Sequence, residues 1–361
     1  MLVQLSEQQE FFRDTTARFL TEQVPTAELR RLRDDATGFE EKYWRQGADL
    51  GWTTLLVSEE HGGGSLSGDG VVDLSLVAFE FGRHAAPGPL VPANLVAAAL
   101  SDAGSYLEVL TDLLSGHTVA AWCDGVEIER DGAAIVVRGR ARPVDAAVAA
   151  RHVLVTDGTT QVLVPAGTAG VTVHPMHSLD LTRRLATVDF AEVRVPIETA
   201  VGEIGGATAA VRRQRLLALV MVTAESVGAM QAGFDMTVAW AFDRYSFGRP
   251  LASYQALKHR FADMLAWLEA AHAISDQAAV AVAAGAPDAE ELASAAKAFI
   301  GKYGTELLQE CVQLHGGIGF TFEHDLHLYV RRHTVNTAMY GTPAEHRQRL
   351  TDLIESREGR P

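Results

Sequence analysis

The sequence predicts a mainly α-helical protein with a central β domain, and two patterns support this expectation. Residues 1–115 and 201–361 hold long stretches with apolar residues at helical spacing. Residues 116–200 hold short runs rich in β-branched residues, which turn residues separate and no helical pattern interrupts. We therefore expect an N-terminal helical domain over 1–115, a small antiparallel β-barrel or sandwich over 116–200, and a C-terminal four-helix bundle over 201–361.

In the N-terminal part, Ser6 followed by Gln9 has the spacing of a capping box, which predicts a helix that begins after Ser6. A second helix is expected to end near Gly51. The loop Gly62-Gly63-Gly64 matches neither of the glycine patterns that bind phosphate and follows no strand, so we interpret it as a turn. Further helices are expected at 71–83 and 91–100.

The later elements follow from the same periodicities. In the C-terminal part, Asp288 stands where it can cap a helix after the Gly-Ala-Pro break. The expected strands cover 118–122, 134–138, 153–156, 161–164, 171–173 and 186–190. The expected long helices cover 211–244, 254–284 and 289–314, and shorter helices follow Phe322 and Pro343.

Composition excludes several function classes. The 361-residue chain is 47% hydrophobic, which supports a sizeable core, and its net charge of −15 argues against nucleic acid as a partner. The two cysteines, Cys123 and Cys311, form no CxxC motif, which is typical of a reducing compartment. We expect a cytoplasmic protein without a secretion signal or a membrane span, because the most apolar run, 216–230, contains Glu225.

Two polar motifs stand out in the helical C-terminal part. Gln313-Leu314-His315-Gly316-Gly317-Ile318-Gly319-Phe320 follows an apolar helix, and its glycines fit either a helix C-cap or a loop that a ligand approaches closely. Arg244-Tyr245-Ser246-Phe247-Gly248-Arg249-Pro250 places two arginines beside a turn. Arginine binds phosphate through two parallel hydrogen bonds, and Phe247 can stack on a planar ring. The alternative is a solvated helix end whose arginines interact favourably with the negative end of the helix dipole.

Together these motifs resemble the acyl-CoA dehydrogenases. The resemblance covers nearly the whole chain and includes Leu50-Gly51-Trp52, Glu60-His61-Gly62-Gly63, Glu80-Phe81-Gly82-Arg83, Arg244-x-x-Phe247-Gly248-x-Pro250 with Gln255, and Gln313 to Phe320. It implies a flavoprotein that holds FAD at a subunit interface and removes the α-proton and β-hydride of an acyl-CoA thioester. The residues matching the family's FAD contacts are Arg244, Ser246, Phe247, Gln255, Gln313, Leu314, Gly316, Gly317 and Thr342.

The chain departs from the family where the flavin ring and the base belong. The family's Thr-Glu-Pro-x-Ala-Gly-Ser-Asp loop is matched by 120–126, which reads Ala-Ala-Trp-Cys-Asp-Gly-Val, and of the Trp-Ile-Thr strand only Thr156 remains. The family's catalytic Glu is matched by Tyr340, and a phenol with a pKa near 10 is a poor base at neutral pH. A second base position known in the family is matched by Ala218. Weak candidates for a base are Glu225, on the same helix face as Ala218, and Glu345.

The resemblance is therefore strongest to partner subunits of actinobacterial heterotetrameric dehydrogenases that act on CoA thioesters of steroid side chains. It implies that this chain is the non-catalytic subunit of an α2β2 enzyme, paired with a homologous catalytic subunit and with electron-transfer flavoprotein or a similar acceptor. Two alternatives stay open, which are a homomeric acyl-CoA dehydrogenase that uses Glu225 or Glu345, and a scaffold without flavin. No metal site is expected, because Glu323-His324-x-x-His327 lacks zinc-ligand spacing.

Overall fold

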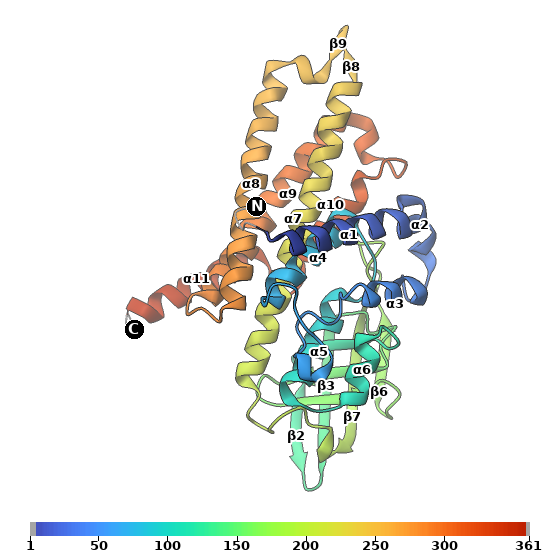
Figure 1. Ribbon diagram of the computed structural model, residues 1–361, viewed down its shortest axis with the longest axis vertical. Helices are drawn as coiled ribbons and strands as arrows, with labels where there is room; N and C mark the ends of the chain where they lie inside the picture. Colours follow the sequence, from blue (N-terminus) through green and yellow to red (C-terminus); the bar gives the residue numbers. More distant parts are fainter. Residues whose placement is uncertain (1–4, 359–361) are drawn as a thin grey trace. The chain divides into compact units, whose positions relative to one another are not determined.

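The computed structural model describes residues 5–358 and groups the chain into two compact units (Figure 1). The helical unit consists of the described parts of 1–28, 75–86 and 219–361, and the β unit consists of 29–74 and 87–218. Helices α4 (Gly70–Arg83) and α7 (Thr208–Asp243) each contribute residues to both units. The domain boundaries expected near residues 115 and 200 stay a prediction.

The β unit contains two sheets, which confirms a central, largely antiparallel β domain. Strands β2 (Glu127–Asp131), β3 (Ala134–Asp145), β7 (Leu185–Pro196) and β6 (Val171–Pro175) form an antiparallel sheet in the order β2-β3-β7-β6. Strands β1 (Ala120–Asp124), β4 (His152–Thr156) and β5 (Gln161–Pro165) form the second sheet.

One strand pair and one strand differ from the sequence-based expectation. Strand β1 pairs with β4 in parallel, so that Trp122 lies opposite Leu154, because the chain passes through β2 and β3 before it returns. Strand β2 was not predicted. Its residues are mostly charged and exposed, so it offers no apolar run or alternation to detect.

The helices of the β unit pack around a tryptophan cluster. They are α3 (Glu41–Asp49), α5 (Leu90–Ala103), α6 (Leu107–Leu114) and the end of α2 (Thr26–Arg31). Trp44 and Trp52 are buried with tilted rings, and an added Cβ at Gly47 would lie 2.1 Å from the Trp52 ring. Glycine at this position is what lets α3 approach that ring.

The helical unit combines α1 (Glu7–Gln23) with most of α4 and α7 and with α8 (Gln255–Ala283), α9 (Ala289–His315), α10 (Leu326–Ala338) and α11 (Pro343–Glu358). The capping box of Ser6 and Gln9 is confirmed at the start of α1. Asp288 occupies the N-cap position of α9, but its side chain makes no capping bond, so that part of the prediction was wrong.

Two glycines bring α4 and α7 close together inside the helical unit. An added Cβ at Gly82 would lie 1.8 Å from the Glu225 carbonyl oxygen, and one at Gly228 would lie 2.0 Å from the Phe79 carbonyl oxygen. Among the described helices, α7 is long and apolar enough to cross a membrane, yet 89% of its most apolar window is buried within the protein. It is therefore a core helix by its packing.

Candidate functional site

The two polar motifs lie at one end of the helical unit. Helix α7 ends at Asp243, α8 runs back from Gln255, and α9 returns to end at His315. Figure 1 shows the α7–α8 hairpin at this end. The ring of Trp240 in the last turn of α7 stacks on the ring of His315, so segments 75 residues apart in sequence come into contact.

The arginine motif forms a tight β-hairpin between α7 and α8. Strands β8 (Tyr245–Ser246) and β9 (Arg249–Pro250) pair, and both residues of the turn, Phe247 and Gly248, have positive φ. Positive φ at both central residues is the geometry that suits a two-residue hairpin. The Tyr254 hydroxyl donates to the Ser246 carbonyl at 2.7 Å. This arrangement leaves the Phe247 side chain 98% exposed at the tip.

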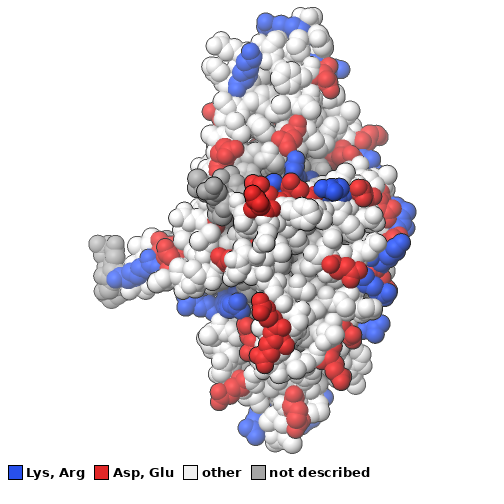
Figure 2. All heavy atoms as spheres, in the orientation of Figure 1, with Lys and Arg blue, Asp and Glu red and all other residues white. Residues whose placement is uncertain are grey.

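Positive charge gathers around this hairpin in a chain that is acidic overall. Arg244, Arg249 and Lys258 are exposed, and the Arg249 guanidinium lies 3.9 Å above the Tyr254 ring centre. Figure 2 shows Lys and Arg atoms on an otherwise largely uncharged surface at this end. Helix α8 begins beside them at the exposed Gln255 without a side-chain cap. An uncapped helix N-terminus beside arginines attracts anions such as phosphate.

Some glycines of the glycine motif are required by the backbone, and another has free space around it that a ligand can occupy. Gly316 has φ +67°, and an added Cβ at the buried Gly319 would lie 2.7 Å from the Val312 carbonyl oxygen. These two glycines serve the helix end and the 3-10 turn η5 (Gly316–Phe320). Gly317 is exposed, and an added Cβ there would meet no atom within 4 Å. Gln313 is exposed as well and Leu314 is half-buried, so a ligand can reach this loop.

Thr342 is not brought to this cluster. It follows α10, which runs away from the glycine loop for 13 residues, or about 20 Å at the rise of an α-helix. The Thr342 hydroxyl and the Glu345 carboxylate form a capping box at the start of α11, with the Thr342 amide donating to Glu345 Oε2 at 2.7 Å. These hydrogen bonds lower the pKa of Glu345. A carboxylate held in this way is a weaker base.

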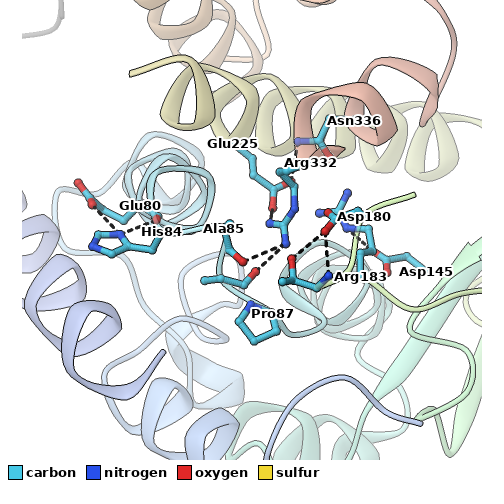
Figure 3. Close-up of polar contacts among 12 residues, drawn as sticks. Glu80, His84, Ala85, Pro87, Asp145, Asp180, Arg183, Glu225, Arg332 and Asn336 are labelled. Carbon is cyan, nitrogen blue, oxygen red and sulfur yellow. Dashed lines mark hydrogen bonds and ion pairs between the residues drawn. The ribbon is translucent and has the colours of Figure 1, made fainter. Parts of the chain in front are cut away.

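Glu225 lies in a buried ion pair inside the helical unit. The Arg332 guanidinium donates to its Oε1 atom, and Asn336 Nδ2 donates to its Oε2 atom at 2.9 Å. Figure 3 shows Arg332 directed at Glu225 and at the Ala85 backbone. Glu225 is 3% exposed and Arg332 belongs to α10, so neither sequence spacing nor periodicity indicated this pairing. The geometry favours a structural carboxylate, and its role as a base stays a hypothesis.

The segment that carries the base in the family is held by polar contacts to its backbone. Tyr340 has φ +57°, and its carbonyl accepts from His346 Nε2 at 3.0 Å. The Lys297 ammonium donates to the carbonyls of Asn336 and Thr337 at the end of α10. Burial lowers the pKa of Lys297 to about 7. These contacts hold the backbone around Tyr340, the phenol that the sequence predicts at the base position.

In the β unit, the segment that matches the flavin loop is a buried strand. Trp122 is 6% exposed, and its Nε1 atom donates to Gln214 Oε1 at 2.8 Å. Gln161 and Gln214 exchange hydrogen bonds at 2.7 and 3.2 Å. Thr156 is fully buried, and its hydroxyl donates to the Thr160 carbonyl at 2.8 Å. These polar groups bond one another within the β unit. Gln214 was missed in the sequence because its partners lie on distant strands.

Comparison with known proteins places the chain in a family. Models of the acyl-CoA dehydrogenase C-terminal and N-terminal domains match residues 208–353 and 6–107. The acyl-CoA dehydrogenase IpdE2 of Mycobacterium tuberculosis is 31% identical over 350 residues, which are 96% of this chain and 98% of that relative.

Solved structures share the fold. The Tcur3481-Tcur3483 steroid ACAD G363A variant has a TM-score of 0.88 at 24% identity and covers 98% of this chain and 99% of its own. The ChsE4-ChsE5 complex from Mycobacterium tuberculosis has a TM-score of 0.88 at 23% identity, with 98% and 99% covered. PigA with FAD and proline also has a TM-score of 0.88, at 19% identity, with 99% and 100% covered. The whole-length relative and the two domain models agree, and the chain belongs to the acyl-CoA dehydrogenase family.

Proposed function

We propose that this chain is a subunit of an FAD-dependent acyl-CoA dehydrogenase and supplies the diphosphate and adenine half of a flavin site to a partner chain. Family membership makes it an oxidoreductase of the acyl-CoA dehydrogenase type. The observation that carries the proposal is an asymmetry. The arginine hairpin and the open glycine loop are assembled in the helical unit, whereas the matching flavin-ring segment of the β unit is a buried strand.

The helical unit has the donor groups that a diphosphate needs. Arg244 and the backbone of Gly317 are exposed, and Gln255 opens an uncapped helix, so charge, amide groups and helix dipole act together. FAD supplies the hydride acceptor when it is bound. This chain's residues would hold the diphosphate, and Phe247 at the hairpin tip would contact the adenine or the partner subunit.

The catalytic base would come from the partner. Oxygens of Glu225 and Glu345 already accept hydrogen bonds, and Tyr340 stands at the family's base position. A general base must have a free lone pair within reach of the proton that it removes. Of the two candidates that the sequence suggested, Glu225 is engaged in a buried ion pair, and the hydrogen bonds to Glu345 lower its pKa, which supports a base from the partner.

The names of structural relatives support a proposal for the partner and substrate classes. Solved structures with this fold include the ChsE4-ChsE5 complex and the Tcur3481-Tcur3483 steroid ACAD. We propose an α2β2 assembly with a homologous catalytic subunit in the cytoplasm and a steroid side-chain CoA thioester as substrate. Electron-transfer flavoprotein or a similar carrier would reoxidise the flavin.

The deciding experiment measures flavin in the chain alone and in a complex with a co-expressed homologue that has the family's Thr-Glu-Pro loop and Glu base. We expect little FAD in the lone chain and full FAD in the complex. Stoichiometric FAD with dehydrogenation by the lone chain would establish the homomeric alternative instead. No FAD in either sample would favour the scaffold.

A second measurement, the FAD content of a Gly317 variant, tests whether the glycine loop is part of the half-site. Gly317→Leu should fold, because the position is open and does not need positive φ, and should strip FAD from the complex. Gly167→Leu is the matched control, since Gly167 is equally open but lies in the β unit. A folded Gly317→Leu complex that keeps its full FAD content would refute the assignment.

A further inference from the structure

Four side chains form one stacked group at the predicted half-site. The Trp240 indole stacks on the His315 imidazole, with ring centres 5.4 Å apart and an interplanar angle of 19°. The His324 ring packs edge-on against His315 at 4.4 Å and against Trp240 at 6.4 Å. The Arg244 guanidinium lies 5.9 Å from the centre of the Trp240 ring. We call Trp240, His315 and His324 the ring stack.

The ring stack joins three segments of the helical unit. Trp240 lies in the last turn of α7, and Arg244 directly follows the last residue of that helix. The Arg244 amide donates to the Trp240 carbonyl at 2.8 Å, so the helical path continues to Arg244 and the two side chains lie on one side of the helix end. His315 is the last residue of α9, directly before Gly316 and Gly317. His324 follows the turn η5 and precedes α10. The stack thus links the helix end that carries Arg244 to the residue directly before the glycine loop.

Hydrogen bonds do not explain why polar rings occupy the ring stack. His315 Nδ1 lies 2.8 Å from the Cys311 carbonyl and so carries the proton, which leaves Nε2 as a bare acceptor. That Nε2 and the Trp240 Nε1 atom are both buried and have no hydrogen-bond partner among residues 5–358. A site that only needed to fill space would do so at lower cost with apolar rings, because buried polar atoms without partners are costly. Tryptophan is, however, the side chain whose face best holds a cation.

Arg244 is free to bind a ligand. It forms no ion pair among the residues that the structure describes, unlike Arg260 nearby, which pairs with Glu310. Its guanidinium lies over the Trp240 face. An exposed arginine without such a contact samples many rotamers and loses that freedom when it binds. A guanidinium already held over a ring loses less.

We infer that Trp240 and His315 are positioning residues, which hold Arg244 at a fixed distance from the glycine loop so that both bind one diphosphate. This inference rests on the proposed half-site and adds the group that aligns its two parts. Trp240 acts through Arg244, and His315 acts through Trp240.

The test uses ADP, because it contains the diphosphate and adenosine groups that the half-site would bind in FAD. Isothermal titration calorimetry measures ADP binding to the full chain. FAD retention by the complex is the second measurement. Trp240→Leu should weaken ADP binding roughly tenfold, as expected for loss of a cation–π contact and of rotamer order. Trp240→Phe should restore most of the affinity, because it keeps a ring face. Trp267→Leu is the matched control, because Trp267 packs on Tyr303 elsewhere in the helical unit.

A double-mutant cycle separates positioning from general support. In an Arg244→Gln background, Trp240→Leu should have no further effect on ADP affinity, because Trp240 acts through Arg244. Additive losses, or a loss with Trp267→Leu as large as with Trp240→Leu, would overturn the inference. Unchanged ADP affinity in Trp240→Leu would also overturn the inference. In that case the proposed half-site would still hold, provided that the unmodified chain binds ADP. An unmodified chain that binds neither ADP nor, with its partner, FAD would overturn the proposed function and the inference with it.

Discussion

Replacing Arg332 with methionine tests whether Glu225 is a structural ion-pair partner or a catalytic base. Arg332 is 1% exposed and donates to Glu225 (Figure 3). It also donates to the Ala86 carbonyl at 3.0 Å. Arg332→Met keeps much of the side-chain volume, but it leaves the Glu225 carboxylate buried with Asn336 as its described donor. The variant therefore removes the positive charge of the pair together with the donor to the Ala86 carbonyl.

The expected cost is large. Removing one partner of a buried ion pair destabilises a protein by about 3–5 kcal/mol, because the other charge remains buried without compensation. The Ala86 carbonyl also loses its donor, which adds roughly 1 kcal/mol. Glu225→Met should be similarly destabilising, since it removes the carboxylate that the buried Arg332 guanidinium binds. The double variant Glu225→Met with Arg332→Met should recover most of the loss, because an apolar pair of similar volume needs no compensation.

Urea unfolding followed by far-ultraviolet circular dichroism gives the free energies for this cycle, and dehydrogenation by the assembled complex gives the activity. We expect strong non-additivity in stability and an active double variant, provided that the complex forms. If Glu225→Met is as stable as the unmodified chain and the complex loses activity, the ion-pair reasoning is refuted and Glu225 is the base.

Two further predictions concern other buried polar groups. Lys297 has a folded pKa of about 7 against an ordinary value of 10.5, so the unfolded chain binds the proton more tightly. Stability should therefore rise between pH 7 and 10 with a slope approaching about 1.4 kcal/mol per pH unit. Lys297→Met should lack that slope in thermal melts, and parallel pH profiles would contradict the assignment. Gln214→Ala removes the acceptor of the Trp122 indole and the partner of the Gln161 amide. It should cost about 1–3 kcal/mol for each buried group left unpaired. Urea unfolding measures this loss, while FAD retention by the complex should not change. A fall in FAD content at unchanged stability would place flavin in the β unit.

The order of helices and strands could be read from the sequence because it is encoded locally. The helices expected at 71–83 and 91–100 appear as α4 and α5 with ends shifted by up to three residues, and the three long C-terminal helices appear as α7, α8 and α9. Their apolar spacing repeats within each segment, so no distant partner is needed to detect them. Strand β2 was missed for the opposite reason, since its mostly exposed residues carry no apolar pattern and the strand is defined by its pairing with the neighbouring strand β3.

The candidate site was predicted in its parts but not in its connections. Arg244, Gln255 and Gly317 were found by their motifs, and the fold places all three at one end of the helical unit. Thr342 belonged to the same predicted set, yet the direction of α10 carries it away from the others. A motif records which residues are present, whereas the path of the chain decides which of them meet.

The sequence by itself determined the family and the alternation of helical and β segments, and it predicts a tyrosine, Tyr340, at the family's base position. Only the tertiary structure decided the partners of the buried polar groups. Glu225 meets Arg332 at a separation of 107 residues, and Trp240 meets His315 across the whole of α8 and α9. The physical reason is that local spacing sets the face of a helix on which a side chain lies, while the packing of distant helices sets what that face meets.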